Sequence, residues 1–358
     1  MKLAKFKKEV KFFFKKQIDQ DFLYKPSEFW NSANLKIYNS IIKNGNIKKF
    51  KSMKINLNFF IPTYKYFFDI NRKFLKKFFK EFSIIKKKRM FFISYINGYQ
   101  GALSDYRTFR SSIEQTDQFG LLNFNESNHC SPAEQFKFEG KCYSKSSLNY
   151  LLGMSFLQNN TKKFYPKVIL EIGGGYGTLG EILKHTRIKN FKYIDVDIVP
   201  MISIAKFYLS KVYKLKKFQS FDRFEKKRKI KIKNLDKINF LCPWHLKKLE
   251  GKISLFINFI SFQEMEPEIV KNYLSIIQNL KPEYILLKNL KEGKNTKFKS
   301  YQINRTYSKK VLKPVKSILY FNQLRKLYKL VKRDVYSFGE KKIDGYNSEI
   351  LLFKKRSN

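Results

Sequence analysis

Cysteine is scarce in this sequence, which contains three, Cys130, Cys142 and Cys242. Three widely spaced cysteines cannot build a disulfide framework, and none of them belongs to a Cys-x-x-Cys pair of the kind that binds metals. No metal site is predicted from the spacing of the other metal-ligating residue types. A reducing, cytoplasmic environment is the expected location.

Long apolar runs are absent as well, and no stretch approaches the roughly 18 apolar residues that a membrane span requires. The N-terminus is basic like that of a signal peptide, but its first apolar stretch, Phe12-Phe13-Phe14, is cut short by Lys15 and Lys16. We therefore expect a soluble protein, or one that is peripheral at the inner face of a membrane.

Acidic residues are few, since 29 Asp and Glu oppose 74 Lys and Arg and leave a formal net charge of +45. Such a charge attracts anions, and a nucleic-acid partner is one interpretation. Only 11 of the basic residues are Arg, however, and the recognition of phosphates and bases relies on Arg. The abundant Lys, Phe, Tyr, Ile and Asn all have A/T-rich codons, so a biased genome is favoured over a functional role as the origin of the charge, and no specific nucleic-acid partner is predicted.

Residues 1–20 place apolar side chains at helical spacing among lysines, which predicts a basic amphipathic helix. Two interpretations fit this pattern. The helix either docks its aromatic face on the body of the protein or contacts an anionic membrane surface. Docking is favoured, because aromatic faces at this spacing more often belong to a core.

Residues 1–143 are predicted to form a helical N-terminal region, with aromatic-rich helical pieces around 29–30, 35–42 and 74–82. Glycines and asparagines then punctuate residues 97–145, where periodicity is weak. Irregular segments of this length are commonly lids or substrate loops. A substrate or lid segment and a poorly ordered connector are both compatible with this pattern.

Residues 144–358 are predicted to form an α/β domain, because short apolar strands alternate with helices there. This alternation is typical of a doubly wound, mostly parallel sheet. The expected strands cover 167–172, 191–196, 238–242, 253–259 and 284–287, and the expected helices cover 144–158, 179–185, 201–213 and 267–279. At the end, a helix over 322–330 precedes an antiparallel hairpin of strands 333–338 and 349–353 that turns near 344–345.

A glycine loop follows the first of these strands, in the segment Glu171-Ile172-Gly173-Gly174-Gly175-Tyr176-Gly177. A loop of this kind between a strand and a helix lets the backbone approach a nucleotide-like cofactor. The sequence from Gly175 to Gly180 also matches the dinucleotide-binding pattern GxGxxG, so an NAD-dependent oxidoreductase that modifies sugars is one alternative. A carboxylate at Glu171 opposes a pyrophosphate but suits the ammonium and sulfonium of S-adenosylmethionine, which favours that cofactor.

An acid at the end of the second strand would accept hydrogen bonds from ribose hydroxyls with either cofactor. Asp195 and Asp197 are the two candidates, and Asp197 is preferred.

Three blocks of the sequence resemble the class I S-adenosylmethionine-dependent methyltransferases, and more narrowly the bacterial sugar O-methyltransferases. They are Leu170–Gly177, Tyr193–Asp197 followed by Pro200, and Ile257–Met265. The resemblance implies a Rossmann-like fold and S-adenosylmethionine as cofactor. It implies methyl transfer to a hydroxyl of a sugar-containing small molecule or a lipid-linked glycan, in nucleotide-sugar or surface-polysaccharide biosynthesis. Given the charge, an RNA-binding methyltransferase is a further alternative.

The residues expected at the site follow from these blocks. Those expected to hold the cofactor are Glu171, Gly173, Gly174, Gly175, Tyr176, Gly177, Asp195 and Asp197. Asn258, Ser261 and Gln263 are expected to face the substrate. Glu264 and His129 are candidates for the general base, although Glu264 also suits the start of a helix and His129 also suits an exposed loop. Whether a divalent metal assists is left open.

Overall fold

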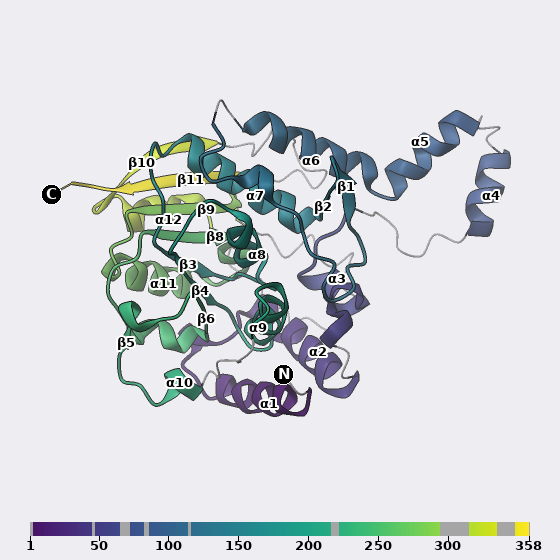
Figure 1. Cartoon of the computed structure of the whole chain (residues 1–358). Coiled ribbons are helices and arrows are strands. Elements are labelled where there is room, and N and C mark those ends of the chain that lie inside the picture. Colours follow the sequence, from purple (N-terminus) through teal and green to yellow (C-terminus); the bar gives the residue numbers. More distant parts are fainter. Residues whose placement is uncertain are drawn as a thin grey trace.

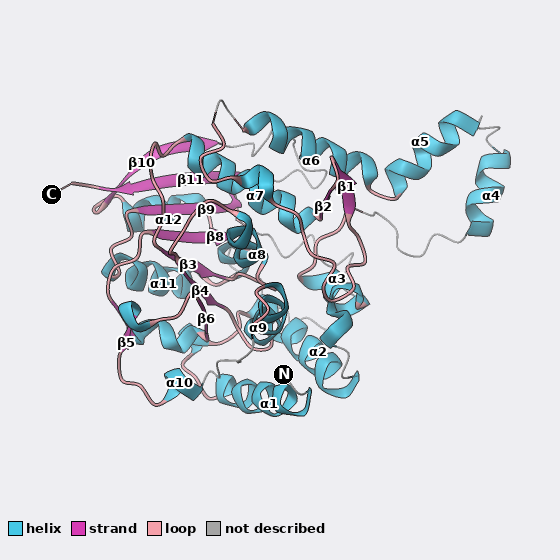
Figure 2. Ribbon diagram, viewed as in Figure 1, coloured by secondary structure: helices cyan, strands magenta, loops and turns pink. Residues whose placement is uncertain are grey.

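The computed structural model shows a central sheet flanked by helices, with a helical N-terminal region beside it (Figure 1). It describes residues 3–44, 47–64, 72–81, 86–113, 116–215, 222–293, 315–334 and 348–357. Figure 2 shows the longer strands gathered in one layer between helices, with a few short strands apart from it.

The main sheet has seven strands in the order β10-β11-β9-β8-β3-β4-β6. Their bounds are β3 Val168–Ile172, β4 Lys192–Val196, β6 Ile238–Leu241, β8 Leu255–Phe259, β9 Tyr284–Leu290, β10 Tyr328–Asp334 and β11 Ser348–Lys355. The first five in sequence pair with one another in parallel, whereas β11 is antiparallel to both β9 and β10. This arrangement confirms the predicted Rossmann-like fold with an antiparallel C-terminal hairpin.

The strand order reverses at β3, which has β4 on one side and β8 on the other. In an open parallel sheet, such a reversal leaves a crevice outside the carboxyl ends of the strands, and ligands bind there. The glycine loop begins where β3 ends. The topology therefore places the predicted cofactor loop at the position where a doubly wound sheet binds ligands.

Helices cover both faces of the sheet. They form two groups whose members contact one another. One group is α7 Lys145–Asn159, α8 Thr178–His185 and α9 Met201–Val212, and the other is α11 Pro267–Asn279 and α12 Ser317–Leu324. The short elements of this part of the chain include α10 Asp222–Glu225 and the strands β5 Ile230–Lys231 and β7 Leu249–Glu250. The described residues contain no helix that is long and apolar enough to cross a membrane.

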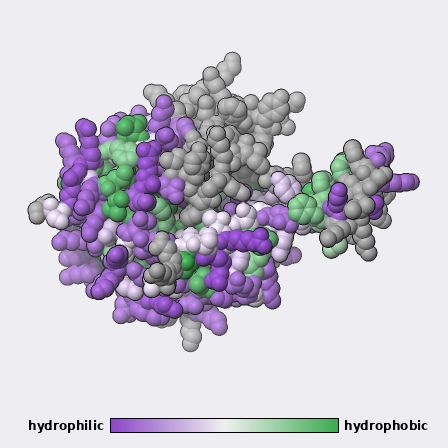
Figure 3. All heavy atoms as spheres, turned by 90° about the horizontal axis from the view of Figure 1, so that it is seen from above, coloured by the Kyte–Doolittle hydropathy of each residue, from purple (hydrophilic) through white to green (hydrophobic). Residues whose placement is uncertain are grey.

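The N-terminal region is mostly helical. Its helices are α1 Leu3–Ile18, α2 Glu28–Asn44, α3 Lys54–Phe59, α4 Arg72–Glu81, α5 Lys86–Ile96 and α6 Tyr99–Ser112. The rings of Phe78 in α4 and Phe92 in α5 are stacked with centroids 5.4 Å apart, and this pair of helices projects from the body (Figures 1 and 3). One hydrophobic cluster includes residues of both the N-terminal region and the sheet, so the core is continuous across residue 143.

Helix α1 docks on the body of the protein. Phe6, Val10 and Phe13 are buried on one face, and the ring centroids of Phe6 and Phe207 in α9 lie 5.8 Å apart. This arrangement agrees with the docking interpretation of residues 1–20. Contact between these residues and an anionic membrane stays a prediction, and the aromatic face that motivated it is covered.

The predicted irregular segment 97–145 was wrong in its first part, because α6 is a regular helix. Gly98 and Gly101 suggested a break. Gly98 instead precedes the helix in the left-handed region with φ 80°, while Gly101 lies inside it, where a Cβ would be 3.0 Å from Cδ1 of Tyr64. Beyond α6, the segment is irregular apart from one turn of 3-10 helix and the hairpin of β1 Phe136–Phe138 and β2 Lys141–Tyr143.

The predicted helix over 322–330 was also wrong. Helix α12 ends at Leu324 and strand β10 begins at Tyr328. Most of β10 is exposed, since it lies at the edge of the sheet, so its sequence lacks the apolar run of a buried strand. The expected turn near 344–345 and the strand residues 335–338 lie outside the described residues.

Candidate functional site

The glycine loop connects β3 to α8 with the backbone in close contact with its surroundings. A Cβ on Gly173 would lie 2.1 Å from Oγ of Ser261, so this position excludes any side chain. Gly175 differs, because its φ is +63° and a Cβ there would meet no atom within 4 Å. The loop is therefore packed against protein at Gly173 and open at Gly175.

Glu171 lies beneath this loop rather than on its open side. Its side chain is fully buried, and its two carboxylate oxygens accept hydrogen bonds from the hydroxyls of Tyr150 (2.6 Å) and Tyr193 (2.5 Å). Burial raises the pKa of Glu171 to about 7, although both tyrosine hydrogen bonds oppose the shift. A Cβ on Gly174 would be 3.0 Å from Oε2 of Glu171, so the carboxyl supports the loop from below.

Asp195 is the second acid beneath the loop. It is fully buried, and neither of its carboxyl oxygens has a hydrogen-bond partner among the described residues. Burial raises the pKa of Asp195 well above its ordinary value, and the nearby Glu171 and Asp197 raise it further. A Cβ on Gly174 would approach Oδ1 of Asp195 to 2.4 Å, so only glycine fits above this carboxyl.

Asp197 is the acid that reaches the open side. It follows β4 directly, is only partly buried, and its oxygens accept hydrogen bonds from the amides of Gly175 (2.9 Å) and Ile198 (2.7 Å). Burial raises the pKa of Asp197 to about 7, against the effect of these two amides. Of the two candidate ribose acids, Asp197 is thus the one beside Gly175.

Tyr176 points away from the open side of the loop. Its ring is buried, with Nζ of Lys51 4.7 Å from its centroid and the ring of Phe50 at 5.8 Å. Its side chain therefore anchors the loop on the N-terminal region. A cofactor contact by Tyr176 would have to come from its backbone.

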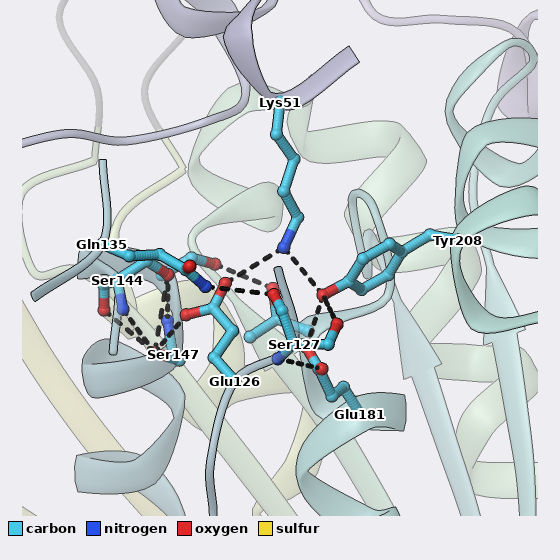
Figure 4. A network of polar contacts seen from close by, with 10 residues as sticks. Lys51, Glu126, Ser127, Gln135, Ser144, Ser147, Glu181 and Tyr208 are labelled. Carbon is cyan, nitrogen blue, oxygen red and sulfur yellow. Dashed lines mark hydrogen bonds and ion pairs between the residues drawn. The ribbon is translucent and has the colours of Figure 1, made fainter. Parts of the chain in front are cut away.

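Lys51 centres a buried polar network that the sequence did not reveal (Figure 4). Its Nζ donates to Oε1 of Glu126 (3.0 Å) and to the hydroxyl of Tyr208 (2.7 Å), which in turn donates to Oε2 of Glu181 (2.5 Å). Burial alone would lower the pKa of Lys51, but the charge of Glu126 and other neighbours outweighs it and raises the pKa to about 12. The network joins the N-terminal region to α8 and α9 directly under the loop, and nothing in its local sequence separates Lys51 from the many other lysines.

The predicted substrate residues of the third block hold the strand ends together. Nδ2 of Asn258 donates to the carbonyl of Ile172 (2.9 Å) and to Oγ of Ser261 (2.6 Å), and Oγ of Ser261 donates to the same carbonyl (3.1 Å). Oε1 of Gln263 accepts a hydrogen bond from the amide of Leu290 (2.8 Å). These bonds tie the carboxyl ends of β3, β8 and β9 to one another, and contact with substrate stays a prediction for all three residues.

Glu264 lies in the same region and meets the N-terminal region. Its Oε2 accepts a hydrogen bond from Nε1 of Trp30 in α2 (3.0 Å), and its carbonyl accepts one from Oγ of Ser27 (2.6 Å). The charge of Glu264 contributes to the raised pKa of Asp197. Glu264 also ends the 3-10 helix that begins at Ser261, whose Oγ lies against Gly173, so Glu264 is in the same part of the fold as the predicted cofactor loop.

His129 is not brought together with Glu264. It is half-buried, and burial together with the charges of Lys184 and Lys211 lowers its pKa. These lysines lie in the last turns of α8 and α9, at the opposite ends of those helices from Gly177 and Asp197. The role of His129 as the general base stays a prediction.

Trp244 and His245, which follow β6, are buried around a single acid. Nε1 of Trp244 donates to Oε1 of Glu225 (2.7 Å), and Nε2 of His245 lies 2.8 Å from the same oxygen. Lys16 of α1 pairs with the other oxygen of Glu225. Among the described residues, no group of three His, Cys, Asp or Glu is placed to hold a metal ion.

No protein-family model and no curated protein matches this sequence. Solved structures match it in part. Magnesium protoporphyrin IX methyltransferase from Synechocystis PCC 6803, solved with bound SAM, is 12% identical, with 59% of this chain and 79% of that chain covered and a TM-score of 0.36. An S-adenosylmethionine-dependent methyltransferase from Aquifex aeolicus is 13% identical, with 56% of this chain and 89% of that chain covered and a TM-score of 0.33. Small RNA methyltransferase HEN1 is 13% identical over 63% of this chain and 27% of that chain, with a TM-score of 0.37.

Because these TM-scores are below 0.5, the assignment of the fold rests on the strand order and the antiparallel last strand.

Proposed function

We propose that this protein is an S-adenosylmethionine-dependent O-methyltransferase that methylates a sugar hydroxyl. The observation that carries the proposal is the glycine loop at the reversal of strand order. It is open at Gly175, and Asp197 stands beside that opening. The resemblance of the three sequence blocks supports the same assignment.

The residues present fit the methyl donor. Gly175 leaves room for the cofactor against the backbone, and Asp197 offers a carboxyl to the ribose hydroxyls. Burial raises the pKa of Glu171, Asp195 and Asp197 and so promotes their neutral forms, and a cationic ligand would favour the ionised forms whereas a pyrophosphate would oppose them. This distribution of charge supports S-adenosylmethionine over NAD.

The reaction is an in-line displacement that positioning alone accelerates strongly. S-adenosylmethionine, when bound, supplies a methyl group on a sulfonium. The acceptor oxygen forms a bond to that carbon as the carbon–sulfur bond breaks, and the hydroxyl proton passes to the carboxylate of Glu264. Nε1 of Trp30 donates a hydrogen bond to Oε2 of Glu264 and so orients the carboxylate that is proposed to take the proton.

Calorimetric titration of the full chain tests the cofactor assignment. S-adenosylmethionine should bind, NADH should not, and Asp197→Ala should weaken S-adenosylmethionine binding by about tenfold or more, since it removes charge-assisted hydrogen bonds to the ribose. Glu283→Ala, an exposed acid at the opposite end of the sheet, is the control. Binding of NADH instead of S-adenosylmethionine would establish the oxidoreductase alternative.

Mass spectrometry of a surface-glycan extract incubated with the protein and S-adenosylmethionine tests the acceptor. We expect the mass of one added methyl group on one sugar. Glu264→Gln should lower turnover while cofactor affinity stays nearly unchanged, and normal turnover would remove Glu264 from the mechanism.

A further inference from the structure

A groove of about 810 Å³ lies between the end of α1, the start of α2 and the start of α11. This volume is within the range of sites that bind small molecules, roughly 300–1,000 Å³. The stacked rings of Phe14 in α1 and Tyr38 in α2, with centroids 3.9 Å apart, hold the two helices together on one side of it. No step of the proposed reaction has used this groove.

The groove adjoins the proposed catalytic acid. Its wall includes Glu266 and Pro267, which follow Glu264 by two and three residues. Oε1 of Glu266 accepts a hydrogen bond from the amide of Glu28 (2.8 Å), so α2 is fastened to the same segment that carries Glu264. A ligand in the groove would therefore lie against the segment that carries Glu264.

The charge of the groove is opposite to that of the whole chain. Its lining holds three acids, Glu28, Glu266 and Glu268, against one basic residue, Lys25, whereas the chain has a net charge of +45. An anionic ligand such as a phosphate would meet carboxylates here, and an uncharged or cationic one would not be repelled. The lining thus disfavours a nucleotide sugar or RNA whose phosphates would sit in this groove.

Two oxygens of lining residues lack hydrogen bonds. Oδ1 of Asn34 and Oε2 of Glu266 are buried and have no partner among the described residues. Both atoms are hydrogen-bond acceptors, so only a donor can satisfy them, and a buried polar atom without a partner is costly. A ligand with hydroxyl or ammonium groups could donate hydrogen bonds to both oxygens.

Apolar side chains surround the same groove. Ile18, Phe22 and Leu35 are 59%, 55% and 50% exposed, although large apolar side chains are usually more covered than this. Sugars present apolar C–H faces as well as hydroxyls, so carboxylates beside an exposed aromatic ring suit them. Apolar surface and acceptors together match an amphipathic, donor-rich ligand.

We propose that this groove binds the methyl acceptor, and that the acceptor is a glycan that is uncharged or carries amino groups in the part the groove holds. The inference rests on the proposed function, because a glycan held in the groove is to place its hydroxyl at Glu264. Glu266 and Glu268 accept hydrogen bonds from the glycan, and Phe22 packs against a sugar face.

Three trisaccharides of equal length test the proposal on the full chain at about 0.15 M salt. They are a glucosamine trimer with amines, maltotriose without charge, and a galacturonic acid trimer with carboxylates. By saturation-transfer NMR and calorimetry, the glucosamine trimer should bind most tightly and the galacturonic acid trimer least. The net charge alone predicts the reverse order, so binding of the acidic trimer as tightly as the amino trimer would overturn the proposal.

Variants then locate the binding. Glu266→Gln combined with Glu268→Gln should weaken binding of the glucosamine trimer by about tenfold. Phe22→Ser should weaken binding of the glucosamine trimer and of maltotriose to the same extent. Glu283→Gln, which removes one acid elsewhere, should change nothing. The conservative amide at position 266 can still accept the hydrogen bond from Glu28, and circular dichroism checks that each variant is folded.

Titration of the same samples with S-adenosylmethionine separates the two proposals. If S-adenosylmethionine binds and no trisaccharide does, the groove proposal is overturned and the proposed function stands. If S-adenosylmethionine does not bind, the proposed function fails whatever the trisaccharides do. If both bind but the groove variants behave like wild type, the glycan site lies elsewhere and the groove proposal is again overturned.

Discussion

Gly175 and Gly140 form a matched pair that tests where the cofactor lies. Gly175 has φ +63° and Gly140, in the turn between β1 and β2, has φ +79°. A Cβ at either position would meet no atom within 4 Å. Gly175→Ala and Gly140→Ala therefore impose similar backbone strain without a clash, and only Gly175 faces the expected cofactor.

The strain sets the expected loss of stability. A left-handed conformation costs an L-residue roughly 1–2 kcal/mol, so both variants should lose about that much free energy of unfolding. The effect on the cofactor is separate, because the new methyl group at Gly175 occupies space where the ligand meets the backbone. We expect S-adenosylmethionine binding to weaken by about tenfold to a hundredfold, which corresponds to about 1.4–2.8 kcal/mol.

Urea unfolding followed by circular dichroism measures the first quantity, and calorimetric titration measures the second. Gly140→Ala should match Gly175→Ala in unfolding and match wild type in binding. If the two variants bind S-adenosylmethionine with equal affinity, the cofactor does not lie against Gly175 and the site described here is misplaced.

Three further predictions follow from buried contacts. Lys51→Met leaves the carboxylate of Glu126 buried without its counter-charge and should cost about 3–5 kcal/mol in urea unfolding, with partial recovery on adding Glu126→Gln; a cost below about 1 kcal/mol would contradict this. Gly153→Ala places a Cβ 2.3 Å from Cζ of Phe259. Overpacking should lower the free energy of unfolding by about 1–3 kcal/mol, which outweighs the helix preference for alanine. A raised melting temperature would disprove the clash. Burial raises the pKa of Asp197 to about 7, and a sulfonium favours its ionised form, so S-adenosylmethionine affinity should rise between about pH 6 and pH 8 with release of protons; affinity that is independent of pH would count against a charged Asp197 in the complex.

The sheet could be predicted from the sequence because its buried strands are short apolar runs. Strand β4 begins one residue later than predicted, and α11 has the predicted bounds. Edge strand β10 could not be predicted in the same way, since its side chains are mostly exposed and its pairing with β11 determines its conformation. Periodicity detects burial, and an edge strand has little of it.

The site was predictable where its residues are neighbours in sequence. The glycine loop and Asp197 follow consecutive strands, and parallel strands bring their carboxyl ends to one edge. The side-chain direction of Tyr176 and the contact between Trp30 and Glu264 depend on packing between segments far apart in the chain. A single sequence without tertiary contacts holds no local signal for either.

The net charge of the chain does not describe the charge at its site. The hydrogen bonds to Glu171 come from tyrosine hydroxyls and those to Asp197 come from backbone amides. Burial raises the pKa of both acids to about 7, so a cationic ligand, which favours their ionised forms, is preferred over an anionic one. The buried cation of Lys51 is matched by Glu126 and does not reverse that preference. Local carboxylates therefore decide which ligand binds, while the many surface lysines govern solubility and long-range attraction to anions.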